Sequence, residues 1–233
     1  MVRLALPYVS CSRRRRIERL ILRRAVAQTL LSELLVRYVA INSFRIGNEQ
    51  IAFGFNPHQK PFVIGLPNFH YNISHSGDWV LCAVDTQPVG IDIERITSTD
   101  RDIALEYFAP DEQRYLNSAI GISERRHRFY EVWTKKESYV KAIGAGLSMP
   151  LHSFSVMDTE QNANCRFQFR LFDSNYAVSI CAAHDEFPEQ IAIKPVHQLL
   201  QLCQSGQEHD TQKPLMDTEA ASRLNRFASM ANA

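Results

Sequence analysis

The sequence predicts an α+β fold built from two similar halves that are related by a pseudo-twofold axis. Helical and strand-like apolar patterns both occur, and each half of the 233-residue chain contains both kinds. The segment DWVLCAVD at 78–85 is also echoed by NYAVSICAAHD at 175–185. Each copy carries an aromatic residue, small apolar residues, a cysteine and a final aspartate, and each closes a strand-rich stretch. A duplicated unit would produce this echo.

The first half opens with a basic stretch that leads into an apolar helical pattern. Residues 13–24 contain seven arginines, and apolar side chains recur at helical spacing as far as Leu35. This pattern predicts one long helix or two abutting helices. Prolines and glycine punctuate residues 53–68, which predicts an extended loop. WVLCAVD at 79–85 is then expected to form a strand buried on both faces, and GIDIERI at 90–96 a second, alternating strand.

The second half begins with helices and ends with strands. The helical pattern covers residues 101–144, with breaks expected near Ala109–Pro110 and in AIGISE at 119–124. Three strand-like segments follow, HSFSVMD at 152–158, CRFQFRLF at 165–172 and YAVSICAAHD at 176–185. The polar tail is expected to be disordered or a loosely held helix. We therefore divide the chain into a first half at 1–89, a second half at 90–203 and a tail at 204–233.

Composition excludes several protein classes. The net charge is +1, which by itself steers no charged partner. The five cysteines are odd in number and contain no C-x-x-C pair, which is typical of reduced thiols in a cytoplasmic protein. No apolar run approaches the ~20 residues that span a bilayer. Pro7 and the arginines after it have the wrong charge order for a secretory signal. Taken alone, the arginine run is typical of a solvated helix surface or a nucleic-acid patch.

Two carboxylates in GIDIERI are candidates for metal binding. Residues two apart on a strand point to the same side, so Asp92 and Glu94 project together. Neighbouring carboxylates repel each other unless a cation lies between them. The alternative is an exposed strand end that happens to carry two acids.

A third carboxylate lies where the helix 133–146 should be apolar. Glu137 falls on the stripe between Trp133 and Val140, and an unpaired buried carboxylate costs several kcal/mol, by order of magnitude. An exposed pair with Lys141 would contribute only roughly 0.3–0.5 kcal/mol, which is too little to explain that position. A Mg²⁺ ion shared with Asp92 and Glu94 would explain it, and an ordinary intrahelical ion pair remains the alternative.

A polar group precedes the first buried strand. NISHSGDW places Ser74, His75 and Ser76 beside Gly77, and hydroxyls, imidazole and backbone amides can all donate to phosphate oxygens. A lone histidine in a loop is usually a surface residue, so this group gains meaning only from its neighbours.

Together these motifs resemble those of the 4′-phosphopantetheinyl transferases, of the surfactin-synthetase-activating type. GIDIE matches the family pattern V/I-G-I/V-D-x-E, and WTKKESYVK matches W-x-x-K-E-x-x-x-K. QKPF, YNISHSGDW and FSVMD extend the resemblance, which runs from about residue 13 to residue 202. It implies the two-half α+β fold of that family, with the active site at the interface of the halves and a monomer whose halves imitate a dimer. Gln59 stands where the family pattern has glycine.

The resemblance implies a metal site and a lysine beside it. Asp92, Glu94 and Glu137 match the Mg²⁺ ligands, and Lys141 matches the lysine that contacts the coenzyme A pyrophosphate.

Members of the family usually begin with a strand that has no counterpart in this sequence. Either the start is truncated or the first half has lost an edge strand.

Coenzyme A contacts are implied in both halves. Lys60, Ser74 and His75 match residues that hold the nucleotide and its 3′-phosphate. Arg13 and Arg16 align with basic residues that contact coenzyme A phosphates, which would give the arginine run a purpose without nucleic acid.

The resemblance implies the reaction of a 4′-phosphopantetheinyl transferase, of the holo-[acyl-carrier-protein] synthase type. The phosphopantetheine arm of coenzyme A passes to a serine of an apo peptidyl or acyl carrier domain, as in nonribosomal peptide and antibiotic synthesis, and 3′,5′-ADP leaves. Glu112 matches an acidic residue proposed as general base in some members and is our first choice, with Glu137 second. Candidates for the carrier-docking surface are Tyr107, Phe108, Tyr115 and Leu116, although core packing would also explain them.

Two rival functions are kept. A catalytically impaired relative would bind coenzyme A or carriers without transfer, and the intact acids and Lys141 argue against it. A basic nucleic-acid-binding module is supported by residues 13–24 alone and would need no metal. We expect a cytoplasmic enzyme with no membrane contact.

Overall fold

The computed structural model describes residues 2–97, 101–158, 164–205 and 227–232, and the chain forms two compact units. Unit 1 comprises residues 1–56, 61–87 and 188–233, and unit 2 comprises residues 57–60 and 88–187. No helix among the described residues is long and apolar enough to cross a membrane. Both helices and antiparallel strands occur in each unit, so the predicted α+β class is confirmed.

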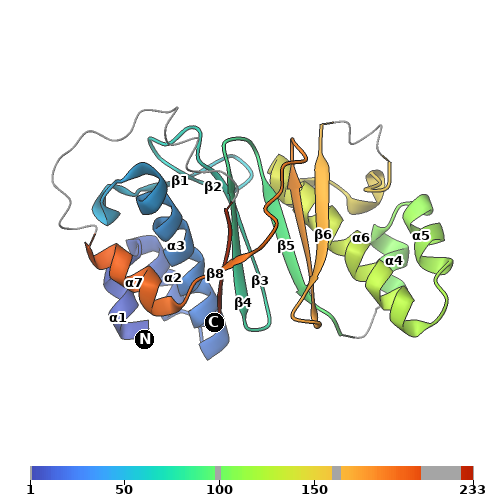
Figure 1. The fold of residues 1–233 in the computed structure, drawn as a ribbon, viewed down its shortest axis with the longest axis horizontal. Helices are drawn as coiled ribbons and strands as arrows, with labels where there is room; N and C mark the ends of the chain where they lie inside the picture. The colour runs from blue at the N-terminus through green and yellow to red at the C-terminus, as the bar shows by residue number, and fades with distance from the viewer. Residues whose placement is uncertain (1, 98–100, 159–163, 206–226, 233) are drawn as a thin grey trace. The chain divides into compact units, whose positions relative to one another are not determined.

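Unit 1 packs helices against a mostly antiparallel sheet, in which only β8 and β9 pair parallel among the described strands, and Figure 1 shows α3 and α7 side by side. Its helices are α1 (Val2–Ala5), α2 (Cys11–Glu18), α3 (Arg23–Phe44) and α7 (Val196–Ser205). Its main sheet has the order β3-β4-β9-β8, with β3 (His70–Ser76), β4 (Trp79–Asp85), β9 (Phe227–Asn232) and β8 (Ala192–Ile193). A separate pair joins β1 (Phe53–Phe55) to β2 (Pro61–Val63), and short 3₁₀ turns cover Leu6–Tyr8 and Asn48–Gln50.

The core of unit 1 forms around α3. Leu30, Leu31, Leu34 and Leu35 are fully buried, which is the apolar stripe that the sequence predicts. The basic stretch forms two helices rather than one, and Ile21 and Leu22 at the break are exposed. Helix α2 starts at Ser10, whose hydroxyl accepts a hydrogen bond from the Arg13 amide at 3.2 Å.

Unit 2 places the long helix α6 (Ile122–Ile143) on a three-stranded antiparallel sheet (Figure 1). The sheet order is β5-β7-β6, with β5 (Gly90–Arg95), β7 (Tyr176–Ala182) and β6 (Arg166–Phe172). Helices α4 (Arg101–Tyr107) and α5 (Pro110–Asn117) precede α6, so the predicted breaks near residue 109 and at 119–124 are confirmed. Two 3₁₀ turns, Gly146–Ser148 and Leu151–Ser153, follow α6.

Glycine fixes the contact between α6 and β5. A Cβ atom added at Gly90 would lie 1.9 Å from the carbonyl oxygen of Ser138 and 2.5 Å from the amide nitrogen of Ala142. Since both are backbone atoms of α6, only glycine allows the helix this close to the strand. Helix α6 then ends at Gly144, which has a φ of 73°.

Several predicted elements differ from the structure. The segment 152–158 forms a 3₁₀ turn and loop instead of a strand, because buried side chains bind its backbone. Residues 53–68, predicted as loop, contain the short strands β1 and β2. Residues 188–203, predicted in the second half, belong to unit 1, where α7 buries Leu199 and Cys203.

The C-terminal tail also differs from the prediction. Most of it, residues 206–226, lies outside the described residues. Residues 227–232, predicted as disordered or loosely helical, form β9 between β4 and β8.

Candidate functional site

The first candidate site lies where α6 meets β5 in unit 2. Asp92 is 2% exposed on β5, and Glu94 stands two residues further along the same strand. The Lys141 ammonium, in the last turn of α6, donates to Asp92 Oδ1 at 2.6 Å. The lysine that the sequence pairs with Glu137 therefore bonds to the strand carboxylate.

Glu137 completes this group from one turn earlier on α6. Burial raises the pKa of its carboxyl group, the Lys141 charge lowers that pKa, and the Asp92 charge raises it further. The mutual effect places Asp92, Glu137 and Lys141 in one electrostatic cluster. The four residues singled out by the sequence thus come from two elements, with Asp92 and Glu94 on β5 and Glu137 and Lys141 on α6.

The donor chemistry of this cluster suits a hard cation. Mg²⁺ prefers carboxylate oxygens, and Asp92, Glu137 and Glu94 offer nothing else. Across the described residues, no three His, Cys, Asp or Glu side chains gather closely enough to hold a metal as they stand. The Lys141 ammonium lies against Asp92 in this arrangement and supplies the positive charge there.

Lys60 supports the same end of α6. Its ammonium donates to the carbonyl oxygens of Lys141 at 2.6 Å, Ala142 at 3.0 Å and Val89 at 3.2 Å. The last carbonyls of a helix lack intrahelical donors and carry partial negative charge, so a cation there is stabilising. Burial lowers the pKa of Lys60 to about 8. The preceding residue, Gln59, has a φ of 66°, which is the left-handed conformation that glycine favours.

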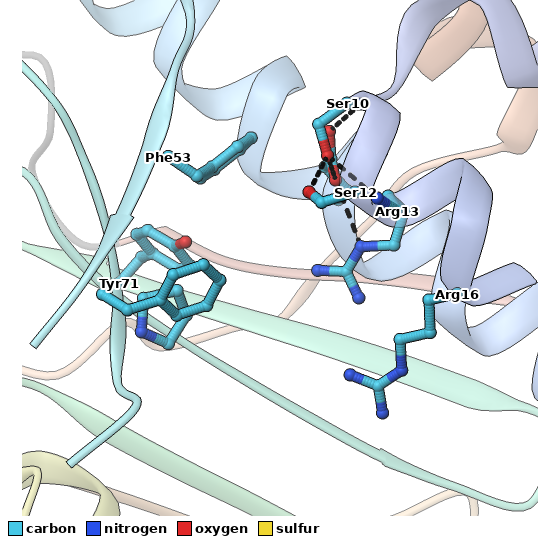
Figure 2. A pocket seen from close by; sticks show the side chains of 9 residues that line it. Ser10, Ser12, Arg13, Arg16, Phe53 and Tyr71 are labelled. Atoms are coloured by element: carbon cyan, nitrogen blue, oxygen red, sulfur yellow. Dashed lines mark hydrogen bonds and ion pairs between the residues drawn. The ribbon is translucent and has the colours of Figure 1, made fainter.

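The second candidate site is a cavity of about 130 Å³ in unit 1. Figure 2 shows the guanidinium groups of Arg13 and Arg16 extending from α2 toward the side on which Tyr71 lies. Phe53 and Phe55 of β1 add aromatic surface to its wall. The pocket therefore combines positive charge with aromatic rings.

Arg13 and Arg16 differ in how they are held. Arg13 Nε donates to Glu33 Oε2 at 3.1 Å, and the Glu33 side chain is 2% exposed. Glu33 also binds Arg37 at 2.8 Å and the Ser10 amide at 2.6 Å. Arg16 is exposed, and none of the ion pairs among the described residues includes it. Its guanidinium is thus available for an anion.

Comparison with known proteins assigns the family. The family model described as 4′-phosphopantetheinyl transferase superfamily matches residues 88–194, and the one described as 4′-phosphopantetheinyl transferase, N-terminal, matches residues 2–87. The 4′-phosphopantetheinyl transferase Sfp of Bacillus subtilis (strain 168) is 36% identical over 203 residues, covering 83% of this chain and 90% of its own. The relative named psf-1, from Bacillus pumilus, is 34% identical over 204 residues, covering 83% and 87%. The one named gsp, from Aneurinibacillus migulanus, is 47% identical over 127 residues, covering 54% and 52%.

The chain belongs to the 4′-phosphopantetheinyl transferase superfamily. The resemblance read from GIDIE and WTKKESYVK is thereby confirmed.

In this phosphopantetheinyl transferase, Ser74 and His75 lie on strand β3, not in a loop. Ser74 is 7% exposed and His75 is exposed. Because they are successive strand residues, their side chains point to opposite faces of the sheet. Neither lines the cavity beside Arg13 and Arg16.

Glu112 has a setting that does not suit a general base. Its side chain is fully buried, and both carboxylate oxygens accept from Lys136 Nζ, at 2.8 and 2.6 Å. The amides of Ala109 and Val156 donate to the same carboxylate at 2.7 and 2.8 Å. A carboxylate that accepts four hydrogen bonds from three donor groups and is closed to solvent cannot readily accept a proton from a carrier serine.

Lys136 is the residue that sequence reasoning missed. It is fully buried on α6, next to Glu137, and its ammonium also donates to the Phe154 carbonyl oxygen at 2.6 Å. Burial lowers the pKa of Lys136, and the Glu112 carboxylate counteracts that effect. The available signal was the family pattern itself, in which this lysine precedes the metal-ligand glutamate.

Proposed function

We propose that the protein transfers the 4′-phosphopantetheine arm of coenzyme A to a serine of an apo carrier domain and releases 3′,5′-ADP. The observation that carries this proposal is the cluster of Asp92, Glu137 and Lys141 at the contact of β5 and α6, in a chain of this family. The carboxylates can hold a cation beside a pyrophosphate group, and the lysine can place its own positive charge there.

The reaction joins the serine oxygen to the β-phosphorus of coenzyme A. The bond between that phosphorus and the oxygen bridging to the α-phosphate breaks, and the electron pair leaves with 3′,5′-ADP. Negative charge develops on the bridging and non-bridging oxygens, so catalysis depends on positioning and electrostatic stabilisation. The Lys141 ammonium supplies positive charge for the leaving group.

We assign the metal and base roles to the same cluster. Asp92, Glu94 and Glu137 would hold Mg²⁺. A Mg²⁺ ion bound there would neutralise negative charge on the pyrophosphate of coenzyme A. Glu137 takes the serine proton, directly or through water, because Glu112 is enclosed by Lys136 and two backbone amides. Glu112 is therefore withdrawn as first choice for the base.

Coenzyme A phosphate binding is proposed for two regions. Arg13 and Arg16 bring cationic groups to the unit 1 cavity, and the rings of Phe53 and Tyr71 offer a surface for a planar base. Lys60, Ser74 and His75 are the remaining proposed contacts with the nucleotide and its 3′-phosphate, on the strength of the family motif. Lys60 would have to leave at least one of its carbonyl partners to reach a phosphate.

The carrier-docking surface is proposed in unit 2 with a revised set of residues. Phe108 and Leu116 are 1% and 3% exposed, so they belong to the core and leave the docking set. Exposed apolar side chains of the same helical region replace them, namely Leu105, Ile120 and Ile122. Tyr107 and Tyr115 are half-buried and stay in the set.

The finer properties of the enzyme are likewise proposed. We infer activity on peptidyl as well as acyl carriers, a cytoplasmic location and a monomeric state. A pseudo-twofold relation between the units is supported by their similar construction, since each places a 22-residue helix, α3 or α6, on antiparallel strands.

One assay tests the function. The protein is incubated with an apo carrier, coenzyme A and Mg²⁺, and the carrier is weighed by mass spectrometry. We expect a gain of one phosphopantetheine arm, reduced by at least about 100-fold in rate by Asp92→Ala or Glu137→Ala, as for loss of a group that stabilises transition-state charge. Lys135→Met, which removes a partly buried lysine paired with Glu131 within α6, is the matched control. An unmodified carrier with the native protein would reject the proposal.

A further inference from the structure

Among the ion pairs in the described part of unit 2, the pair of Lys136 and Glu112 is the one closed off from solvent on both sides. Lys136 and Glu112 are each 0% exposed, and their charged atoms lie 2.6 Å apart. The Phe154 ring lies 4.3 Å from the Lys136 ammonium, which adds a cation–π contact to the hydrogen bonds. The surroundings therefore hold both charges in one geometry.

The pair ties three segments together. Glu112 stands in the first turn of α5 and accepts from the amide of Ala109, which precedes that helix. Its other amide donor, Val156, and the carbonyl acceptor of Lys136, Phe154, both lie in the loop after the 3₁₀ turn Leu151–Ser153. Asp111 and Ser155 form a second hydrogen bond between α5 and this loop. Lys136 thus anchors the middle of α6 to two elements outside the sheet.

This anchor lies one residue from the proposed catalytic cluster. Successive residues of an α-helix are about 100° apart, so Lys136 faces α5 while Glu137 projects from another side of α6, where its charge interacts with that of Asp92 on β5. Because the contacts of Lys136 keep α6 from rotating about its axis, they also fix the direction in which Glu137 projects. Lys141, little more than one turn further on, is fixed with it.

We propose that Glu112 and Lys136 act as a positioning pair, which sets the rotation of α6 and thereby the placement of Glu137 and Lys141 for phosphopantetheinyl transfer. The inference rests on the proposed function. It differs from the base hypothesis for Glu112, because both members of a positioning pair are needed equally, whereas a base would act without Lys136.

Single substitutions should disturb the pair more than its joint replacement. Glu112→Gln or Lys136→Met leaves one buried group without its partner, and the loop or the helix must shift to satisfy it. The double variant Glu112→Leu/Lys136→Met puts apolar side chains of similar size in the same space and removes both charges together. The effects of the two substitutions should therefore be non-additive.

The test combines two readouts at a temperature where every variant is folded. Hydrogen exchange of residues 137–143 is measured by mass spectrometry, and kcat and KM for coenzyme A are measured across pH by carrier mass. We expect each single variant to speed exchange in that segment and to lower kcat at least tenfold, with KM changed less than threefold. The pH dependence of kcat should keep its native shape, and the double variant should recover part of the loss.

Two control variants separate position from stability. Lys135→Met removes a partly buried lysine beside Lys136 that pairs with Glu131 within α6, and it should leave both readouts unchanged. Leu116→Ala destabilises the same core from α5 but keeps both charged side chains of the pair, and it should leave kcat unchanged while the protein is folded.

The outcomes separate the alternatives. Loss of activity and of one limb of the pH profile in Glu112→Gln, with Lys136→Met unaffected, would overturn the inference in favour of a base. A normal kcat in both single variants, or an equal loss of kcat in Leu116→Ala, would show that the pair only stabilises the fold and does not position Glu137 and Lys141. If the native protein left the carrier unmodified, the proposed function would fail, while hydrogen exchange would still decide whether the pair positions α6.

Discussion

The Lys60 ammonium is bound by backbone carbonyl oxygens. Three carbonyl oxygens surround its ammonium, and burial lowers its pKa to about 8 from the ordinary 10.5. Between those pH values the unfolded chain binds more protons at this residue than the folded chain does. The free energy of unfolding should therefore rise with pH in this window, through this residue alone.

Replacement by methionine isolates that contribution. The difference in unfolding free energy between native protein and Lys60→Met should grow from pH 8 to about pH 10.5 and then level off, measured by urea denaturation at several pH values. Titration of other groups cancels in the difference. Parallel curves for the two proteins would contradict the lowered pKa.

Arg16 and Arg13 should respond differently to truncation. Arg16→Ala should raise KM for coenzyme A several-fold and change stability by less than about 0.5 kcal/mol, because Arg16 is exposed and makes none of the ion pairs found among the described residues. Arg13→Ala should raise KM and also destabilise, since it leaves buried Glu33 with one cation fewer. Arg15→Ala, exposed on the same helix and absent from the cavity wall, is the control. An unchanged KM in both variants would remove the cavity from the coenzyme A site.

Side chains in a motif could be predicted from the sequence, and their partners could not. Asp92, Glu94, Glu137 and Lys141 follow from spacing on a strand and a helix together with the family pattern. The contact of Lys141 with Asp92 and of Lys136 with Glu112 joins residues 49 and 24 positions apart. Such pairs depend on how α6 docks, which no local pattern encodes.

At the scale of elements, the docking of α6 on β5 depends on Gly90. Alanine there would place a methyl group against the backbone of Ser138 and Ala142, so the helix must move away. Gly90→Ala should lose roughly 1–3 kcal/mol of stability or more, because backbone gives way less easily than a side chain. It should also lower kcat by moving Glu137 and Lys141 relative to Asp92.

The glycine variant is measured by thermal unfolding and by carrier mass. Ser148→Ala, which removes an exposed hydroxyl in the 3₁₀ turn after α6, is a control that should leave both values near native. Native stability and kcat in Gly90→Ala would mean that the helix does not need this close approach.

Regular elements with a strong period were predictable, and irregular ones were not. Strands β4, β5, β6 and β7 and the breaks between α4, α5 and α6 follow from apolar patterning and from Pro110 and Gly121. The segment 152–158 has an alternating pattern but no partner strand, because Lys136 and Glu112 bind Phe154 and Val156. Pattern alone cannot reveal that backbone groups are taken by side chains.

At the scale of the whole molecule, unit 1 is assembled from distant parts of the chain. Strand β9 pairs antiparallel with β4 and parallel with β8, so the order β3-β4-β9-β8 joins residues 70–85 to residues 192–193 and 227–232. A strand paired on both sides supplies hydrogen bonds to two neighbours. Its loss should therefore destabilise unit 1 without altering the sheet of unit 2.

Ser229 offers a test at the centre of β9, opposite Cys82 on β4 and Ala192 on β8. Ser229→Pro removes the backbone donor at a position where proline does not fit a central strand, while Ser229→Ala keeps that donor and is the control. We expect the proline variant to lose on the order of 2–3 kcal/mol, and Tm to fall by roughly 2–4 °C per kcal/mol. Amides of β4 and β8 should exchange faster in deuterated solvent, and those of β5 and β7 should not change. A central strand that contributes to stability cannot lose a backbone donor without loosening its neighbours. Equal exchange in the proline and alanine variants would therefore show that β9 contributes nothing to the stability of unit 1.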